Sequence, residues 1–411
     1  MSSTISWPQA LAWRMGRQLL DPPAELPVAD VVRRLGGVQS QVASSAELAI
    51  RVRRRTSRPG DVARALAAGT VIKTWAMRGT LHLLTPQEGA SFLSLMASGK
   101  AWERPSWVRA FGMTPAALEG LREVVRESLD GRILTREELI QAVGTRPDLR
   151  HLADGLRSGW GTLLKPLAWQ GELCFGPSQG SRVTFVRPDQ ASPRWAGVPH
   201  SEEAAPIAIA AYLRAYGPAT RERFGRWLAS GWFGKRQLNG WFDALGDRLA
   251  EVDIDGESAV VLAEDLEELM SASPAKTLRL LPGFDGWVLG PGTDDVRVLP
   301  AARRSLVSRQ SGWIAPTVVV GGVVSGTWKL AGGRVEVEWF PEAGRVPRRD
   351  LAAEVTRLSA ILARDLAMEV EVADERRRAD GSRSRGGNQR TARPGAGGPR
   401  RLRGDGAQRR L

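Results

Sequence analysis

The sequence predicts an α+β protein made of three tandem winged-helix modules and a C-terminal α+β domain. Two observations predict it. Segments with helical periodicity are followed three times by a pair of short β-prone runs, which is the order of elements in a winged helix. Beyond Ser273 the pattern changes to strands with one long amphipathic helix. The predicted parts are residues 1–112, 113–187, 202–272 and 273–374, followed by a basic tail over 375–411.

The first module contains four predicted helices and one hairpin. Its first helix covers Ile5–Leu20, because apolar side chains recur there at helical spacing: Trp7, Leu11, Met15 and Leu19. Prolines and the Gly36-Gly37 pair separate the next helices, which we expect over 28–35, 42–52 and 61–68. The hairpin covers Thr70–Leu84, which is rich in β-branched and aromatic residues and has Arg78-Gly79 near its middle.

The second and third modules repeat this order. Helices are expected over 115–129, 135–143 and 158–169, and the second of them opens with Thr135 and Glu138 at capping-box spacing. A hairpin over 170–187 follows. The third module has predicted helices over 202–215, 220–229 and 235–245. Its hairpin over 249–262 turns at Asp255-Gly256, a strong hairpin signal.

The C-terminal domain is predicted from short β-prone runs at 278–281, 287–289, 318–320, 323–328 and 334–339. An amphipathic helix over 349–366 and a last strand at 368–372 complete it. Asp285 is expected to cap a turn. Most of the 15 tryptophans occupy helix or strand positions where we expect core packing and not base stacking.

The composition is that of a soluble globular protein, with 42% hydrophobic and 25% charged residues. No run approaches the roughly 18 apolar residues of a membrane span, and Met1–Trp13 lacks the pattern of a secretory signal. The single cysteine, Cys174, cannot form an intramolecular disulfide, which fits a reducing cytoplasm. The three histidines lie far apart in the sequence. We therefore expect a cytoplasmic protein with no metal site and no cofactor.

The positive charge is concentrated at the C-terminal end. The chain has a net charge of +13, and residues 375–411 hold 12 arginines against three acidic residues, which leaves +9 in the tail and +4 in the body. This tail is rich in Arg, Gly, Pro and Ser, so we expect it to be disordered. It either adds salt-sensitive affinity for nucleic-acid phosphates or is a dispensable extension.

Four segments resemble, in order, the AlkZ/YcaQ-type DNA glycosylases, a winged-helix superfamily, and the similarity spans most of residues 1–372. The segments are TWAMRGTLHLLTPQE at Thr74–Glu88, AYLRAYGPATRERFGRWLA at Ala211–Ala229, LLPGFDGWVLG at Leu280–Gly290 and APTVVVGGVVSGTW at Ala315–Trp328. The resemblance implies a monofunctional glycosylase that removes N-alkylated purines from duplex DNA. Bulky adducts and interstrand crosslinks are further substrates that the resemblance suggests.

The resemblance also implies the catalytic residues. That family has a catalytic Gln-x-Gln or Gln-x-Asp motif near its first winged helix, and this sequence has Gln39-Ser40-Gln41 at the matching place. We therefore assign catalysis to Gln39 and Gln41. Ser40 is polar where the family usually has an apolar or small residue. Gly36-Gly37 before the motif and the predicted helix after it place the pair at a helix entry, where both amides are able to converge.

Amide side chains suit this reaction if the leaving base is already cationic. An N7-alkylated guanine carries a positive charge, so its departure needs no proton from the enzyme. The remaining tasks are to place a water at the sugar carbon and to stabilise an oxocarbenium-like centre. A glutamine positions water by donating and accepting hydrogen bonds, although it is a poor base. A neutral lesion would demand stronger acid–base catalysis.

Basic residues supply the candidates for DNA contacts. Three lie on the predicted first wing, two in the basic cluster after the motif, and three before the C-terminal strands: Lys73, Arg78 and His82; Arg51 and Arg54; Arg303, Arg304 and Arg309. For each the alternative is a solvated surface residue or, for His82, a structural histidine.

Two functions without catalysis compete with the glycosylase hypothesis. One is a winged-helix transcription regulator that recognises sequence in the major groove. The other is a scaffold protein that binds nucleic acid through its tail. Regulators are usually dimers, whereas three modules in one chain indicate a monomer. A regulator prefers one sequence over bulk DNA, whereas a glycosylase prefers lesions and leaves abasic sites.

Overall fold

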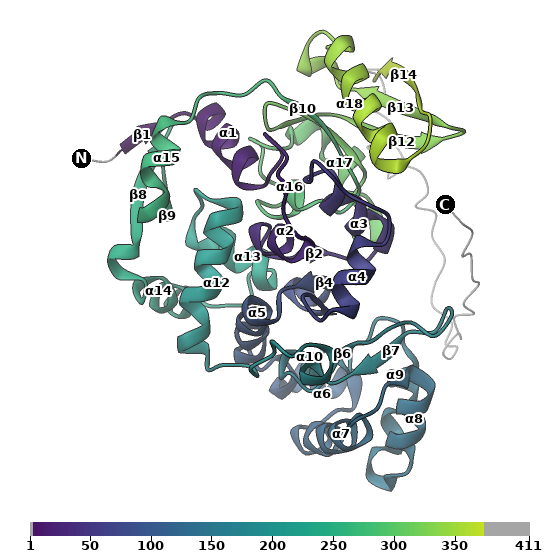
Figure 1. The fold of residues 1–411 in the computed structure, drawn as a ribbon. Helices are drawn as coiled ribbons and strands as arrows, with labels where there is room; N and C mark the ends of the chain where they lie inside the picture. Colours follow the sequence, from purple (N-terminus) through teal and green to yellow (C-terminus); the bar gives the residue numbers. More distant parts are fainter. Residues whose placement is uncertain (1–2, 374–411) are drawn as a thin grey trace, which may run out of the picture. The chain divides into compact units, whose positions relative to one another are not determined.

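The computed structural model describes residues 3–373, so the predicted tail at 375–411 lies outside the described residues. The described part is a mixed α+β structure, as predicted (Figure 1). The N-terminal elements follow the prediction closely, except that two short strands were not expected, one before the first helix and one after the second. They are β1 (Ser3–Ile5), α1 (Trp7–Arg17), α2 (Val28–Arg34), β2 (Val38–Gln39), α3 (Ala43–Arg51), α4 (Asp61–Ala67), β3 (Ile72–Trp75), η1 (Met77–Gly79) and β4 (Leu81–Leu84).

The middle of the chain is mostly helical, and the predicted capping box of Thr135 and Glu138 is present at the start of α8. Its elements are α5 (Pro86–Ser98), η2 (Ala101–Glu103), α6 (Pro105–Phe111), α7 (Pro115–Ser128), β5 (Leu134–Thr135), α8 (Arg136–Gly144), η3 (Pro147–Leu152), α9 (Ala153–Arg157), α10 (Lys165–Trp169), β6 (Cys174–Phe175), β7 (Thr184–Val186), α11 (Pro188–Ala191), α12 (Ser201–Tyr216), α13 (Arg221–Ala229) and α14 (Lys235–Asp243).

The remaining elements form two sheets and their covering helices. They are η4 (Gly246–Arg248), β8 (Leu249–Ile254), β9 (Glu257–Leu262), η5 (Ala263–Asp265), α15 (Leu266–Ser271), β10 (Leu278–Leu281), α16 (Gly286–Leu289), η6 (Ala301–Arg303), α17 (Arg304–Val307), η7 (Gln310–Gly312), β11 (Thr317–Val320), β12 (Val323–Ala331), β13 (Arg334–Trp339), η8 (Pro341–Ala343), α18 (Arg348–Leu362) and β14 (Ala367–Val372).

All three predicted hairpins are antiparallel pairs, β3–β4, β6–β7 and β8–β9. The first two belong to one six-stranded sheet with the order β2-β4-β3-β6-β7-β5, because Lys73 of β3 pairs with Phe175 of β6. The third hairpin is extended by β1, which pairs with β8 in parallel. The sheet that contains Gln39 therefore draws strands from two of the predicted modules.

The C-terminal sheet has the order β10-β11-β12-β13-β14, and α18 lies across it (Figure 1). Trp328 and Trp339 of the sheet pack with Leu351, Val355 and Leu358 of the helix. A second, larger core gathers buried side chains from many elements between Ile72 and Leu262. Most tryptophans lie in these cores or partly buried beside them, as predicted, and those with exposed side chains are Trp160, Trp232 and Trp313.

Two predicted elements are wrong. The helix expected over 158–169 is only α10, because Gly161 adopts a positive φ of 63° in the turn before it. A Cβ at Gly161 would also lie 2.1 Å from the ring of Trp75, so the chain turns there against that ring. The strand expected at 287–289 is the short helix α16, for which Asp285 is the N-cap. Within residues 3–373 no helix is long and apolar enough to cross a membrane.

Candidate active site

The Gln39-Ser40-Gln41 motif lies where a strand passes into a helix. Gln39 ends β2, and α3 begins two residues after Gln41. The Ser40 amide donates to the Leu81 carbonyl at 2.7 Å, so the backbone stays on the edge of the sheet through the middle of the motif. This is the helix entry that the sequence predicts for the pair.

Two glycines set the direction in which the chain enters the motif. Gly36 and Gly37 have φ values of 59° and 107°, which favour glycine. A Cβ at Gly37 would lie 2.6 Å from a methyl carbon of Leu84, so the turn also packs too closely against β4 for a side chain. The Gly37 amide donates to the Val32 carbonyl at 2.9 Å and closes the end of α2. Gln39 thus follows a tightly fixed turn.

Gln39 belongs to a polar row that crosses three strands. Its Cα is paired with that of His82, and His82 is paired with Thr74, so the three side chains share one face of the sheet. The Gln39 Oε1 and Thr74 Oγ1 atoms are buried and have no hydrogen-bond partner within the described part of the protein. Buried polar atoms are nearly always hydrogen-bonded, so these two are suited to bind water or substrate.

His82 is the neutral centre of this row. Its ring is 3% exposed, and Nδ1 lies 3.0 Å from the Thr80 carbonyl. Burial lowers the pKa of His82 to about 3, and the nearby charge of Arg78 acts in the same direction. The expectation that His82 contacts a phosphate therefore needs correction: its ring is buried and uncharged, and its position opposite Gln39 gives it a structural role.

The other two residues of the motif differ in exposure. Ser40 is 3% exposed, and its Oγ has no partner among the described residues. This position is part of the packed interior, which is why a small side chain fits it. Gln41 is exposed, whereas Gln39 is half-buried. One amide thus faces solvent at the start of α3 while the oxygen of the other is enclosed.

The basic cluster after α3 is mostly an internal scaffold. Arg51 is buried and donates to the Ile361 carbonyl and to Ser57 Oγ. Arg53 is fully buried and forms a two-pronged ion pair with Asp285 at 2.7 and 2.8 Å. Arg54 is half-buried and binds the Leu26 carbonyl and Asp61. The prediction that Arg51 contacts DNA is wrong, because its guanidinium is buried and stabilises α18.

The two cations of the β3–β4 hairpin are half-buried. The Lys73 Nζ lies 5.6 Å from the centroid of the Phe175 ring, and burial lowers its pKa. Arg78 lies in η1, has a φ of 55° and donates to the Trp227 carbonyl of α13 at 2.7 Å. Burial lowers the pKa of Arg78 as well. Both side chains stay near the sheet that carries Gln39.

The three C-terminal candidates divide by exposure. Arg303 is 3% exposed, is bonded to Glu342 at 2.6 Å and lies over the Phe340 ring, so its expected DNA contact is corrected. Arg304 and Arg309 are exposed. The Nε of Arg304 lies 3.4 Å from Thr293 Oγ1, and that of Arg309 donates to the Leu306 carbonyl at 3.1 Å. These two remain candidates for phosphate contacts.

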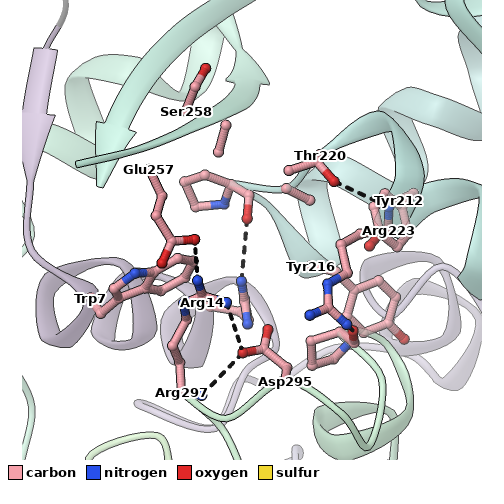
Figure 2. A pocket seen from close by; sticks show the side chains of 14 residues that line it. Trp7, Arg14, Tyr212, Tyr216, Thr220, Arg223, Glu257, Ser258, Asp295 and Arg297 are labelled. Atoms are coloured by element: carbon pink, nitrogen blue, oxygen red, sulfur yellow. Dashed lines mark hydrogen bonds and ion pairs between the residues drawn. The ribbon is translucent and has the colours of Figure 1, made fainter. Parts of the chain in front are cut away.

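A small cavity of about 50 Å³ lies beside α1, with Arg14 at its centre (Figure 2). Arg14 is buried and donates to the carbonyls of Gly217 and Pro218. Arg297 bonds Asp295 and Glu257 in the same cavity. Charged side chains of both signs thus line this cavity between α1, β9 and the turn that joins α12 to α13. Their hydrogen bonds and ion pairs hold these elements together.

Sequence reasoning missed Thr74 and the neutral state of His82. The alternation along β3 was the available signal for Thr74, because it places that residue on the same face as His82 and Gln39. Nothing in the sequence shows that this face is covered. Within residues 3–373 no group of three or more His, Cys, Asp and Glu side chains is arranged to hold a metal ion.

Comparisons with known proteins agree with one another. The family described as DNA glycosylase AlkZ-like matches residues 32–361. A curated protein of Streptomyces sahachiroi, named interstrand DNA cross-link repair glycosylase, is 47% identical over 360 residues, which are 87% of this chain and 97% of that protein. The solved structure of Streptomyces sahachiroi DNA glycosylase AlkZ matches with a TM-score of 0.87 and 45% identity, covering 90% of this chain and 100% of that chain.

Proposed function

Because the chain belongs to the AlkZ-like family of DNA glycosylases, we propose that it hydrolyses the N-glycosidic bond of N-alkylated purines in duplex DNA, with Gln39 and Gln41 as its catalytic residues. The observation that carries this assignment is the buried Gln39 Oε1, which has no hydrogen-bond partner among residues 3–373. An enclosed acceptor at a fixed strand end is what the positioning of a nucleophilic water requires.

The proposed mechanism divides the work between the two amides. The Gln39 oxygen accepts a hydrogen bond from water and directs the oxygen lone pair of that water toward the sugar carbon. The exposed Gln41 contacts the substrate side of the same water or the sugar. The water oxygen forms a bond to the sugar carbon, the glycosidic bond breaks, and its electrons neutralise the cationic base. The proton that the water loses passes to bulk solvent, because neither amide accepts it. Neutral His82 takes no part in proton transfer near pH 7.

The substrate range is proposed to include interstrand crosslinks. The Streptomyces sahachiroi relative is named for crosslink repair, and the two chains align over nearly their full lengths. A crosslink through the N7 atom of a purine contains the same cationic base as a simple N7-alkyl adduct. The same water attack therefore releases one end of the crosslink without a further catalytic group.

The finer organisation belongs to the same proposal. We place three winged helices at 1–112, 113–187 and 202–272, and their hairpins β3–β4, β6–β7 and β8–β9 support this division. Of the predicted phosphate contacts we retain the residues that are exposed or half-buried: Arg54, Lys73, Arg78, Arg304 and Arg309. The protein acts as a cytoplasmic monomer on duplex DNA, and 375–411 adds non-specific affinity.

The test measures base release and binding separately. A duplex with a single N7-methylguanine is incubated with the wild type, with Gln39→Ala and with Gln41→Ala, and alkali-sensitive strand breaks are counted. Each substitution should lower the excision rate at least about a hundredfold, the size of effect expected when a positioning or transition-state interaction is removed, while DNA affinity stays nearly unchanged. Gln87→Ala, an exposed glutamine of α5, is the matched control.

The outcomes separate the competing functions. Equal losses of excision and binding in the glutamine variants would make these residues structural. If the wild type releases neither N7-methylguanine nor one end of an N7-crosslinked duplex, the glycosylase proposal fails. Preference for one undamaged sequence over bulk DNA would then identify a regulator.

A further inference from the structure

A cavity of about 210 Å³ lies between η1, the start of α13 and the loop that follows α16. Its lining contains the guanidinium groups of Arg78, Arg223 and Arg226 and the carboxylate of Asp294. Arg78 lies in η1, whereas Arg223 and Arg226 lie more than a hundred residues later in α13. Asp294 lies in the loop after α16, so only the folding of the chain brings these groups together. Three cations and one carboxylate leave the cavity with a net charge of +2.

The carboxylate is shared by two of the three arginines. Asp294 accepts from Arg223 Nη1 and from Arg226 Nη1, each at 2.8 Å. The Asp294 side chain is 41% exposed and that of Arg226 is 55% exposed, so this pairing faces solvent and is weak. If a further anion enters the cavity beside the Asp294 carboxylate, the guanidinium groups of Arg223 and Arg226 already lie close together and still have free N–H donors for it.

Arg78 is the unbalanced charge. Its Nη1 donates to the neutral Trp227 carbonyl, and no carboxylate among residues 3–373 lies within ion-pair distance of its guanidinium. Arg14 in the cavity of Figure 2 is buried more completely than the half-buried Arg78, but the carboxylate of Asp295 favours its charge. A partly desolvated cation without an anion is unfavourable, and a bound anion offsets that cost. The asymmetry marks the Arg78 cavity as the one built to receive an anion.

The loop beside the cavity is shaped by glycines. A Cβ at Gly290 would lie 2.0 Å from the ring of Tyr216, and a Cβ at Gly292, whose φ is 99°, would lie 2.7 Å from Asp294 Oδ1. A Cβ at Gly292 would also lie 3.4 Å from Arg223 Nη1, so at this position the backbone lies close to an arginine of α13. A tetrahedral anion fits such a site better than a flat one, because donors approach it from several directions.

The cavity is connected to the polar row of the candidate active site through Arg78. Arg78 lies in η1, which joins β3 to β4, and His82 of β4 is the strand partner of Gln39. A cationic N7-alkylated base is repelled by a net charge of +2, so the lesion base does not occupy this cavity. The DNA group of opposite sign that lies next to every base is the backbone phosphate.

From this geometry we infer that Arg78, Arg223 and Arg226 form a pocket for one phosphodiester of the damaged strand, which fixes the register of the lesion relative to Gln39. The inference rests on the proposed glycosylase function. Bidentate and charge-assisted bonds from arginine to phosphate position a duplex without reading its sequence. Asp294 holds Arg223 and Arg226 in place until the phosphate enters.

The test replaces single phosphates by neutral methylphosphonates. The full chain is titrated with duplexes that contain a stable abasic analogue, and the neutral linkage is moved one position at a time along both strands. Wild type should lose about tenfold in affinity at one or two adjacent positions, the cost of one charge-assisted contact. The exposed variant Arg226→Gln should bind more weakly and lose this position dependence. Arg78→Met is a second variant, used only if it folds.

Two matched controls lie on the same helix and its neighbour. Arg221 of α13 is paired with Asp243 at 2.9 Å, outside the cavity. Arg221→Gln should keep the position dependence of the wild type. Asp294→Asn should bind duplex more tightly than Asp243→Asn, because only Asp294 competes with the phosphate. Similar affinities for the two asparagine variants, or a scan without position dependence, would overturn the inference.

A free anion and failure of the proposed function give distinct results. If inorganic phosphate raises the melting temperature of the wild type and not that of Arg226→Gln, while the methylphosphonate scan is flat, the pocket binds free phosphate and the DNA assignment is wrong. Base excision is measured in parallel. Excision with a flat scan rejects only the pocket, whereas a position-dependent scan without excision rejects only the glycosylase function.

Discussion

His82 lies opposite Gln39 with its ring buried and bonded to the Thr80 carbonyl. A charged imidazole there would sit beside the Arg78 guanidinium in a desolvated environment, so the ring stays neutral. It fills the row between two buried acceptors without adding a charge that would repel a cationic base. The residue type of His82 suggested a phosphate contact, whereas its burial indicates a structural role.

The lowered pKa of His82 predicts how the free energy of unfolding depends on pH. The pKa of His82 falls from 6.5 to about 3 on folding, so the unfolded chain binds more protons between these values. The stabilising contribution is complete above pH 6.5 and is lost as the pH falls, by about 1.4 kcal/mol per pH unit below that value. Urea unfolding of His82→Gln at pH 5 and pH 7 should show a smaller difference than the wild type.

The exposed His151, bonded to the Gly112 carbonyl, supplies the control variant His151→Gln. This control should keep the pH dependence of the wild type. If His82→Gln also keeps it, the ring of His82 is protonated in the folded protein and the neutral role assigned to it is wrong.

Elements far apart in sequence are held together by the ion pair of Arg53 and Asp285. Arg53 follows α3, and Asp285 caps α16 by accepting from the Trp287 amide at 2.8 Å. Arg53 also donates to the carbonyls of Gln18 and Ala49, so nearly all of its donors are used. The pair ties the helix after the Gln39-Ser40-Gln41 motif to the C-terminal sheet region, and the predicted capping role of Asp285 is confirmed.

Breaking this pair should be costly. Asp285→Asn leaves a buried guanidinium without its anion and should lower the free energy of unfolding by about 3–5 kcal/mol, measured by urea denaturation. Asp243→Asn breaks the exposed pair with Arg221 and should cost less than about 1 kcal/mol. Equal shifts of the two urea midpoints would contradict the assignment of Arg53 and Asp285 as a structural clamp.

In the whole molecule, the largest apolar core and the largest excess of positive charge lie in different parts of the sequence. The largest apolar core draws its side chains from elements between Ile72 and Leu262, and the described arginines are extensively paired with carboxylates or carbonyls. The tail at 375–411 carries +9 of the net charge of +13. A truncation of residues 375–411 therefore tests whether the tail contributes to DNA binding.

Deletion of 375–411 should weaken DNA binding most at low salt. The slope of log Kd against log salt should become shallower by up to about 0.9 for each phosphate that the tail no longer neutralises, while the rate of excision at saturating enzyme stays the same. Affinities measured between 50 and 200 mM salt, about the range in which such charges are screened, test this. An unchanged slope would make the tail a bystander.

Elements that depend on local signals were predictable from the amino-acid sequence. Helices with caps and apolar periodicity, such as α8 with Thr135 and Glu138, and the β8–β9 hairpin at Asp255-Gly256 were predictable because a few neighbouring residues specify them. The order of four family-like segments likewise pointed to a DNA glycosylase, and the match over 32–361 confirms that family.

The burial of polar side chains depends on the packing of distant segments and could not be predicted from the sequence. Arg51, His82 and Arg303 look like surface groups in the sequence, but their partners are distant segments that no local pattern reveals. The turn at Gly161 and the short α16 depend in the same way on contacts with Trp75 and Arg53. Burial is a property of the packed chain, and it fixes charge, accessibility and therefore the role of each residue at the site.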